Sequence, residues 1–299
     1  MMPVQANTSL RGQLLEHEPM SRHTSWRVGG PADHFYIPAD LDDLAAFLKS
    51  LAPREPVYWV GLGSNLLVRD GGVRGTVIMT SNALNSLSVM QSDLVRAEAG
   101  VASAKVARFC TERGLSGAEF LAGIPGTIGG ALAMNAGAFN GETWKIVEAV
   151  ETIDHHGERR TRPITDYVVG YRSLQGPSGE WFTAARFRLT AGDPAQGKTL
   201  IKSLLAKRGA TQPTQLPNAG SVFKNPPNNH AARLIEACGL KGAREGKARI
   251  SDLHANFIVN MGGATAADIE RLIARVQDAV AQQHGVKLEP EVRVIGEPA

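Results

Sequence analysis

The sequence predicts an α+β protein of more than one domain. Strands and helices alternate over roughly the first third of the chain, residues 146–190 show the alternating pattern of β-strands, and the last third returns to helical spacing. With 299 residues, the chain is long enough for two or three domains. Its 43% hydrophobic and 20% charged residues are typical of a soluble globular protein.

The N-terminal part is predicted to form a small α/β unit, after a weakly structured segment at residues 1–20. A helix is expected to begin after Asp40 and to end before Pro53 and Pro56. Its apolar face consists of Leu41, Leu44, Ala45, Leu48 and Leu51. Strands are predicted at 57–60, 66–68 and 76–80.

The remaining elements follow from the same patterns. A strand at 94–99 precedes a helix that we expect Ser103 to cap and Gly114 to end. His156-Gly157 marks a hairpin turn within the β region. Further elements are expected as a short linking helix at 200–207, helices near 229–238 and 266–284, and strands at 256–260 and 286–295.

Charge and cysteine content exclude several classes of protein. The net charge of +3, from 32 basic and 29 acidic residues, does not indicate a nucleic-acid-binding surface. Cys110 and Cys238 lie among apolar residues at helical spacing, which is typical of core residues in a reducing compartment. There is no CxxC or HExxH metal motif, no signal sequence and no long apolar run, so we expect a cytoplasmic protein that binds no metal and no membrane.

Two glycine-rich segments could bind a ligand. Residues 61–65 follow a strand but lack the third glycine of a dinucleotide-binding fingerprint, so a plain β-turn stays open as an alternative. Residues 124–131 and 134–138 would let a backbone approach a ligand closely, although tight packing also requires small residues. Together the segments suit a long ligand with a central diphosphate, such as a dinucleotide.

Three groups of polar residues could carry chemistry. Ser221 lies in a polar segment, 218–226, that is either a binding loop or a surface turn. It lacks the GxSxG motif of a nucleophile, and a hydroxyl can instead donate a proton to a developing carbanion. Arg172 follows Tyr171 at an expected helix end and could bind a carboxylate or form a surface ion pair. Glu289, Glu291 and Arg293 are expected on one face of a strand.

Read in order, these segments resemble the UDP-N-acetylenolpyruvoylglucosamine reductase family, flavoenzymes of peptidoglycan precursor synthesis. The resemblance extends from about Thr24 to Gly296. The matching segments are Arg27-Val28-Gly29-Gly30-Pro31-Ala32, 61–67, 122–130, 134–138, Gly170-Tyr171-Arg172, 218–226, His254-Ala255-Asn256-Phe257 and Glu291-Val292-Arg293.

The resemblance implies a vanillyl-alcohol-oxidase-type (PCMH-type) FAD-binding fold of two subdomains, with a C-terminal α/β substrate-binding domain. The implied domains are 1–80, completed by 285–299, then 81–208 and 209–284. The implied reaction is the NADPH-dependent, FAD-mediated reduction of the enolpyruvyl group of UDP-N-acetylglucosamine enolpyruvate to UDP-N-acetylmuramate. The resemblance also implies a monomer with non-covalent FAD and a nucleotide-sugar substrate.

The family's functional residues map onto matching positions of this chain. By resemblance, Ser221 protonates the substrate, while Arg172 and Glu291 are its electrostatic partners. Tyr171, Asn225 and Arg293 match substrate-binding positions. The implied cofactor-binding residues are Gly61, Gly63, Ser64, Asn65, Gly123, Ile124, Pro125, Gly126, Thr127, Gly129 and Gly130.

The chain resembles the shorter branch of the family, because only a brief turn fits between Arg172 and Trp181, where the longer branch has a loop with a tyrosine. Other hypotheses stay open. An oxidase or dehydrogenase of the same flavin fold explains the glycine segments but not Arg172, Ser221 and Glu291. A nucleotide-sugar transferase without flavin and a non-catalytic nucleotide-binding regulator are the alternatives from other classes.

Overall fold

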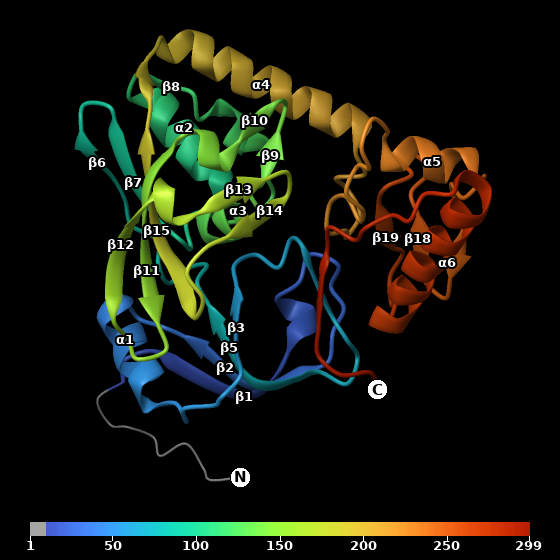
Figure 1. Cartoon of the computed structure of the whole chain (residues 1–299), viewed down its shortest axis with the longest axis horizontal. Coiled ribbons are helices and arrows are strands. Elements are labelled where there is room, and N and C mark those ends of the chain that lie inside the picture. Colours follow the sequence, from blue (N-terminus) through green and yellow to red (C-terminus); the bar gives the residue numbers. More distant parts are fainter. Residues whose placement is uncertain (1–9) are drawn as a thin grey trace. The chain divides into compact units, whose positions relative to one another are not determined.

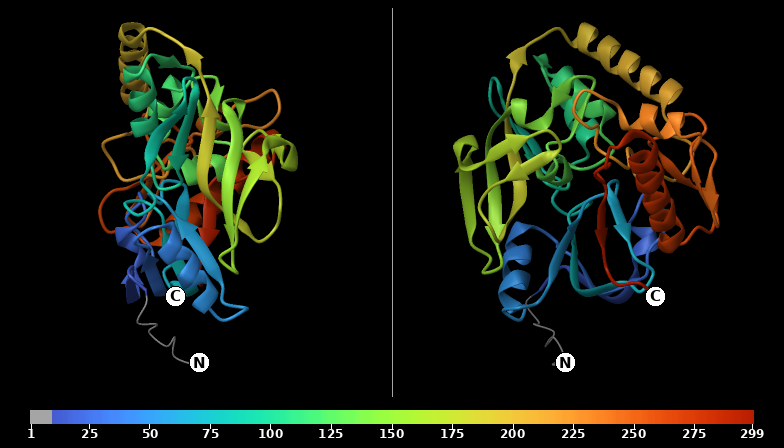
Figure 2. Two further views of the ribbon diagram at one scale, coloured as in Figure 1. Left: turned by 90° about the vertical axis from the view of Figure 1, so that its left-hand side faces the viewer. Right: turned by 45° about the vertical axis from the view of Figure 1, so that its right-hand side comes forward.

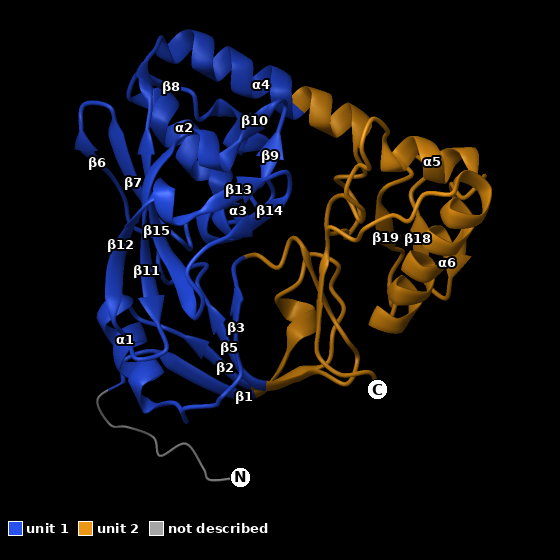
Figure 3. Ribbon diagram, viewed as in Figure 1, with its two compact units in different colours: residues 1–16, 34–61, 75–205 blue, residues 17–33, 62–74, 206–299 orange. Residues whose placement is uncertain are grey.

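A computed structural model describes residues 10–299 and divides the chain into two compact units (Figures 1 and 3). Unit 1 consists of Met1–Glu16, His34–Gly61 and Gly75–Leu205. Unit 2 consists of His17–Asp33, Leu62–Arg74 and Ala206–Ala299. The three-domain division given above, with boundaries at 80, 208 and 284, stays a prediction.

A four-stranded sheet, most of whose residues belong to unit 1, has helix α1 beside it. The strand order is β1 (Gln13–Pro19), β2 (Pro31–Ile37), β5 (Val73–Met79) and β3 (Val57–Val60), and β3 and β5 run parallel. Helix α1 (Leu41–Ser50) begins as predicted after Asp40, whose side chain accepts a hydrogen bond of 2.9 Å from the Asp43 N–H. Tyr36 and Phe47 stack in this core with their ring centroids 3.6 Å apart.

The expectation of weak structure at residues 1–20 is wrong where the structure describes them. Residues 1–9 lie outside the described part, but residues 13–19 form β1 at the edge of the sheet. This strand is mostly exposed and carries charged residues, so it shows no alternation of apolar side chains. Its hydrogen-bonding partner, β2, comes from a later part of the sequence.

A second, five-stranded sheet in unit 1 is entirely antiparallel. Its order is β12 (Arg159–Pro163), β11 (Val147–Asp154), β15 (Glu180–Arg188), β7 (Leu94–Glu98) and β6 (Leu87–Gln91). The β region predicted at 146–190 and the strand at 94–99 are confirmed. The hairpin β11–β12, visible in both views of Figure 2, turns at Gly157, which has a φ of +72°.

Helices α2 (Ser103–Glu112) and α3 (Ile128–Ala133) share a buried core with this second sheet. Ser103 is not the N-cap of α2. That position is Ala102, and Ser103 instead donates its backbone N–H to the Gly126 carbonyl at 2.9 Å. Helix α4 (Pro194–Thr211) is much longer than the predicted 200–207, and the boundary between the units falls within it.

The short strands and 3-10 helices complete unit 1. The remaining pairs are β8 (Leu115–Ser116) with β16 (Thr190–Ala191), β9 (Gly137–Ala138) with β10 (Gly141–Glu142), and β13 (Val168–Gly170) with β14 (Ser173–Gln175). The 3-10 turns are η2 (Glu119–Gly123), η3 (Thr143–Lys145) and η4 (Ile164–Asp166).

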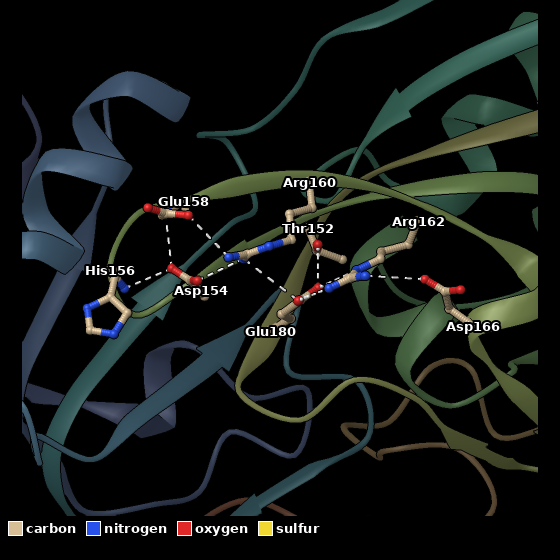
Figure 4. Close-up of polar contacts among 8 residues, drawn as sticks. All are labelled: Thr152, Asp154, His156, Glu158, Arg160, Arg162, Asp166 and Glu180. Atoms are coloured by element: carbon tan, nitrogen blue, oxygen red, sulfur yellow. Dashed lines mark hydrogen bonds and ion pairs between the residues drawn. The ribbon is translucent and has the colours of Figure 1, made fainter.

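Charged side chains cross-link one face of β11, β12 and β15 (Figure 4). The Glu180 carboxylate, whose side chain is only 9% exposed, accepts hydrogen bonds from Arg162 at 2.6 Å and from the Thr152 hydroxyl at 2.7 Å. The Arg162 hydrogen bond is the main reason that the pKa of Glu180 is lowered, and Thr152 and Arg160 add to the effect. Nearby, Arg160 pairs with Asp154 at 2.7 Å. This network ties the three strands together.

Replacing Glu180 with glutamine is expected to destabilise the protein by about 1 kcal/mol at neutral pH, because buried charge-assisted hydrogen bonds are lost. The lowered pKa means that the carboxylate contributes stability above its unfolded pKa and loses it as the pH falls through the folded value. The difference from wild type should therefore shrink below about pH 4. Chemical denaturation across pH measures it. As a control, Glu236→Gln removes an ion pair with a carboxylate side chain that is 57% exposed, and should cost no more than about 0.5 kcal/mol.

Unit 2 is built around helices α5 (Ala231–Ala237) and α6 (Ala266–His284), which confirm the two C-terminal helices that were predicted. Helix α6 ends at Gly285, which has a φ of +65°. It begins with a capping box formed by Thr265 and Asp268, and Asp70 accepts two further hydrogen bonds of 2.9 Å from its first two N–H groups.

The strands of unit 2 are short. The sheet β17 (Arg244–Glu245), β18 (Ala248–Ile250) and β19 (Ile258–Asn260) packs against α6, and β20 (Arg293–Ile295) runs parallel to β4 (Leu66–Val68). The predicted strand at 286–295 is therefore confirmed only at its end. Segment 17–33, which includes η1 (Met20–Arg22), belongs to this unit, and Trp26 is fully buried in its core.

Neither cysteine of the described chain forms a disulfide. Burial raises the pKa of Cys110 to about 12, as expected for an unreactive core thiol. Within residues 10–299, no helix has the length and apolar content to cross a membrane. The same residues contain no group of three or more His, Cys, Asp or Glu side chains suited to a metal ion.

Candidate functional site

The glycine-rich segment 123–130 lies in unit 1, held against the end of β7 and the start of α2. The Gly129 N–H donates to the Ala99 carbonyl at 2.8 Å, and the Ile128 N–H donates to Val101 at 2.9 Å. Packing explains two of its glycines, since a Cβ at Gly123 would lie 2.4 Å from the Phe139 ring and one at Gly129 would lie 3.0 Å from the Ala99 Cβ. Packing does not explain the exposed Gly130, where an added Cβ would meet nothing closer than 4.0 Å.

Gly61 and Thr127 bring the two predicted cofactor segments of unit 1 together. A Cβ on Gly61 would lie 2.3 Å from the Thr127 Oγ1, so only glycine lets the backbone pass this close. The Thr127 hydroxyl is buried, and it has no hydrogen-bond partner in the described chain. A buried hydroxyl normally has a partner, so these residues fit a bound polar ligand such as the FAD implied by the resemblance.

The other half of the first glycine segment belongs to unit 2. Gly63 has a φ of +58°, and a Cβ there would lie 2.1 Å from the His23 carbonyl oxygen, so this glycine allows tight packing of two backbones. The Asn65 side chain donates to the Glu291 carbonyl at 3.1 Å. Segment 63–65 therefore adjoins the C-terminal segment that carries Glu291.

Arg172 lies in unit 1 and occupies a hairpin turn, not the helix end expected from the sequence. Gly170 pairs with Ser173, so Tyr171 and Arg172 form the two-residue turn between β13 and β14. Arg172 has a φ of +50°. Its guanidinium donates to the carbonyls of Gly137 at 2.8 Å and Asn135 at 3.4 Å. These bonds fix the direction of the half-buried side chain, while Tyr171 is 53% exposed.

Asn135 anchors this turn and was not among the predicted site residues. Its side chain donates to the Gly170 carbonyl at 3.0 Å and to Glu142 at 3.2 Å, and accepts from the Trp144 N–H at 3.2 Å. Asn135 is 1% exposed and has a φ of +41°. The only signal in the sequence was the position of Asn135 within the glycine-rich segment 134–138.

Ser221 lies in unit 2, in a segment that hydrogen bonds fix on two sides. On one side, the Glu291 N–H donates to the Val222 carbonyl at 2.8 Å, and the backbone N–H of Lys224 donates to the backbone carbonyl of Glu289 at 2.9 Å. On the other side, the Val222 N–H donates to the Asn256 carbonyl at 2.9 Å. The segments that carry Ser221 and Glu291 are therefore direct neighbours, although 70 residues separate them in the sequence.

The segment before Ser221 turns sharply. The Asn218 side chain accepts from the Gly220 N–H at 2.9 Å, and its amide donates to the carbonyls of Pro213 and Leu216 at 3.0 and 2.7 Å. Gly220 has a φ of +75°. Ser221 itself is partly exposed. These bonds fix the shape of the turn, and the two alternatives given above, a binding loop and a surface turn, both stay open.

Arg293 and Asn225 are the other predicted polar residues of unit 2, and different parts of the chain hold them. Arg293 begins β20, and its N–H donates to the Asn65 carbonyl at 3.0 Å. Since β20 starts only at Arg293, Glu289 and Glu291 do not share a strand with it as expected. Asn225 is exposed, and its Oδ1 accepts a hydrogen bond of 3.0 Å from the Ala231 N–H at the start of α5. Its Nδ2 has no hydrogen-bond partner among residues 10–299.

Two sequence profiles match the chain. That of the FAD binding domain matches residues 32–162. That of the C-terminal domain of UDP-N-acetylenolpyruvoylglucosamine reductase matches residues 212–295. The first match includes the glycine-rich segments of unit 1, and the second includes Ser221 and Glu291.

Relatives match over nearly the full length. UDP-N-acetylenolpyruvoylglucosamine reductase of Methylococcus capsulatus is 62% identical over 96% of this chain and 94% of its own. The protein of the same name from Alkalilimnicola ehrlichii is 59% identical over 96% of both chains.

A solved structure agrees with these matches. The crystal structure of UDP-N-acetylenolpyruvylglucosamine reductase from Thermus caldophilus has a TM-score of 0.82 and 34% identity, covering 95% of this chain and 99% of that one. The predicted α+β, FAD-binding fold and the predicted family are confirmed. This chain belongs to the UDP-N-acetylenolpyruvoylglucosamine reductase family.

Proposed function

We propose that this protein is a flavin-dependent oxidoreductase that reduces the enolpyruvyl group of UDP-N-acetylglucosamine enolpyruvate to give UDP-N-acetylmuramate, with NADPH as the electron donor. The FAD-binding-domain match and the names of the relatives support this activity. One structural observation carries the assignment of roles: the 2.8 Å hydrogen bond from Glu291 N–H to the Val222 carbonyl. It makes the segment that carries the Ser221 hydroxyl a direct neighbour of the one that carries the Glu291 carboxylate, which supports a shared role for the two at one substrate carbon.

The proposed roles follow from the chemistry of each side chain. FAD, once bound and reduced by NADPH, would supply the hydride that adds to the methylene carbon of the enolpyruvyl group. Negative charge then develops on the adjoining carbon and its carboxylate. Arg172 binds that carboxylate through its guanidinium fork, Ser221 Oγ donates a proton to the carbon, and Glu291 stabilises the enol form.

The positions proposed to bind the rest of the nucleotide sugar are Tyr171, Asn225 and Arg293. Tyr171 offers an exposed ring and Asn225 offers its free Nδ2 group. Arg293 is an exposed cation that would suit an anionic part of the substrate. We extend the proposal to a cytoplasmic monomer. We also propose that FAD is bound non-covalently, because no histidine lies within 117–142 to form a covalent link.

The proposal is tested with the purified protein. It should be yellow, and mild acid denaturation should release free FAD. NADPH oxidation should depend on the enolpyruvyl sugar, and the product should be the lactyl ether. A colourless protein that gains no colour with added FAD, or NADPH oxidation that ignores the sugar, would contradict the proposal.

Thr127→Val is expected to weaken FAD binding about tenfold, since FAD would provide the missing partner of the hydroxyl. The FAD-free protein should become more stable by about 1 kcal/mol, because valine removes a buried hydroxyl that lacks a hydrogen bond. Flavin-fluorescence titration measures the affinity, and denaturant unfolding measures the stability.

Thr111→Val is the matched control. The Thr111 hydroxyl is likewise buried without a partner among the described residues, but Thr111 lies on α2 and is not a predicted cofactor residue. This variant should gain similar stability with unchanged FAD affinity. Equal FAD affinity in both variants would show that the Thr127 hydroxyl does not bind the cofactor.

A further inference from the structure

Asn256 holds the residues that follow Ser221 through three hydrogen bonds. Its Oδ1 accepts from the Phe223 N–H at 3.0 Å, and its Nδ2 donates to the Phe223 carbonyl at 2.8 Å. Its own carbonyl accepts from the Val222 N–H at 2.9 Å. One residue thus satisfies both backbone groups of Phe223 and one of Val222.

All these groups are buried, which makes the contacts costly to lose. Asn256 is 4% exposed, Phe223 is 2% exposed and Val222 is 1% exposed. Without the Asn256 side chain, the Phe223 N–H and carbonyl would be buried without partners, so the segment would have to shift to regain them. Ser221 directly precedes Val222, the first of the two residues that Asn256 holds, and would shift with them.

Asn256 is itself fixed from behind. Its N–H donates to His254 Nδ1 at 3.3 Å, and His254 packs edge-on against Phe257. Burial, with a smaller contribution from Lys241, lowers the pKa of His254, which keeps the ring neutral and able to accept this bond near neutral pH.

We propose that Asn256 is a positioning residue that sets the place of the Ser221 hydroxyl for proton transfer. This inference rests on the proposed function, in which Ser221 donates a proton to the substrate carbon. Proton transfer requires heavy atoms within hydrogen-bonding reach, and a displacement of about 1 Å can cost about a hundredfold in rate. Asn256 acts through Val222 and Phe223, and it needs no contact with substrate.

The test separates the two half-reactions. The flavin of the holoenzyme is reduced in stopped flow with NADPH, or with dithionite, and its reoxidation by the enolpyruvyl sugar is followed by absorbance. Asn256→Ala should slow reoxidation about a hundredfold and leave reduction by NADPH within about threefold of wild type. Equal slowing of both half-reactions, or none, would overturn the proposal.

Asn256→Asp adds a readout that a purely structural role would not change. A protonated carboxyl has both an acceptor and a donor, as the amide has, whereas a carboxylate would face the Phe223 carbonyl without a donor. The reoxidation rate of this variant, divided by that of wild type, should rise at least about tenfold from about pH 9 to about pH 6, since burial raises the pKa of the carboxyl. Dividing by wild type removes the titration of His254, Lys241, Lys224 and Glu289, which both proteins share. A ratio that does not change with pH contradicts the proposal. This test can be made even if Asn256→Ala does not fold.

Asn260 provides the matched control. It is also buried, and its side chain donates to the Trp26 carbonyl at 2.9 Å and accepts from Gly262 and Ala264 at 2.8 and 3.1 Å. None of these bonds reaches segment 221–224. Asn260→Ala should lower stability without changing the ratio of the half-reactions, and selective slowing of reoxidation in this variant would argue against Asn256.

A double-variant cycle separates this inference from the proposed function. If Asn256 acts only through Ser221, adding Asn256→Ala to Ser221→Ala should slow reoxidation by less than about threefold. A further hundredfold loss in the double variant overturns the positioning role alone. Wild-type reoxidation in Ser221→Ala would instead overturn the role of Ser221 itself.

Discussion

Ser221→Ala is expected to slow reoxidation of the reduced flavin by the enolpyruvyl sugar by about a hundredfold to ten-thousandfold, the usual contribution of a positioned general acid. Reduction by NADPH should be nearly unchanged, because that step requires no proton from Ser221. FAD binding should also persist, because the Ser221 side chain does not hold its segment in place. The backbone of residues 222–224 is held by hydrogen bonds with Asn256 and with the backbone of residues 289–291. Stopped-flow traces of the two half-reactions measure both outcomes.

Ser221→Cys is the conservative partner variant. A thiol is also a proton donor, so reoxidation should recover part of the loss seen in alanine. A solvent deuterium isotope effect on reoxidation should be present in wild type and Ser221→Cys if the hydroxyl or thiol transfers the proton. Equal loss of both half-reactions in Ser221→Ala would show that the serine supports folding or cofactor binding and does not act as the acid.

The sequence predicts elements whose own residues carry the signal. Helix α6 has an apolar stripe, a capping box and a terminal glycine, and the structure places its ends where these signals predict. The β11–β12 hairpin likewise follows from alternation and from the turn at Gly157. In each case the local pattern and the tertiary environment favour the same conformation.

Elements without a local signal were missed or misplaced. Helix α4 buries only Gly197 and Ile201, so it has almost no apolar face, and its length could not be predicted from periodicity. Strand β1 is an exposed, charged edge strand that depends on β2 for its hydrogen bonds. Ser103 has the right residue type for a cap, but its N–H donates to the Gly126 carbonyl. The N-cap is Ala102, so the helix begins one residue earlier than expected.

The candidate site shows the same division. Motifs pointed to Arg172, Ser221 and Glu291, whose roles remain predictions. The residues that hold them were not predicted, because Asn256 and Phe223 are 33 residues apart, and Asn135 and Gly170 are 35 residues apart. Hydrogen bonds of this kind leave no periodic pattern in a single sequence.

The second large effect is expected on stability. Trp26→Ala should lower the free energy of unfolding by about 3–5 kcal/mol, the usual cost of removing a large, fully buried aromatic side chain. Trp26 lies in segment 17–33 but packs in the core of unit 2 with residues of the C-terminal part of the chain. Its Nε1 donates to the Ile258 carbonyl at 2.7 Å, and its own carbonyl accepts from Asn260. The substitution therefore removes apolar contacts and leaves the buried Ile258 carbonyl without its donor.

Trp26→Phe separates these two losses. Phenylalanine keeps most of the apolar contacts but not the N–H, so the cost should fall to about 1–2 kcal/mol from the unpaired Ile258 carbonyl together with a small cavity. Denaturant unfolding at one saturating FAD concentration for all variants gives the comparison, because bound ligand adds to apparent stability. If Trp26→Ala cost less than about 1 kcal/mol, segment 17–33 would not belong to the folded core of unit 2. Nearly equal costs for the two variants would instead assign most of the stabilisation to the single hydrogen bond, since both variants lose it whereas Trp26→Phe keeps most of the apolar contacts.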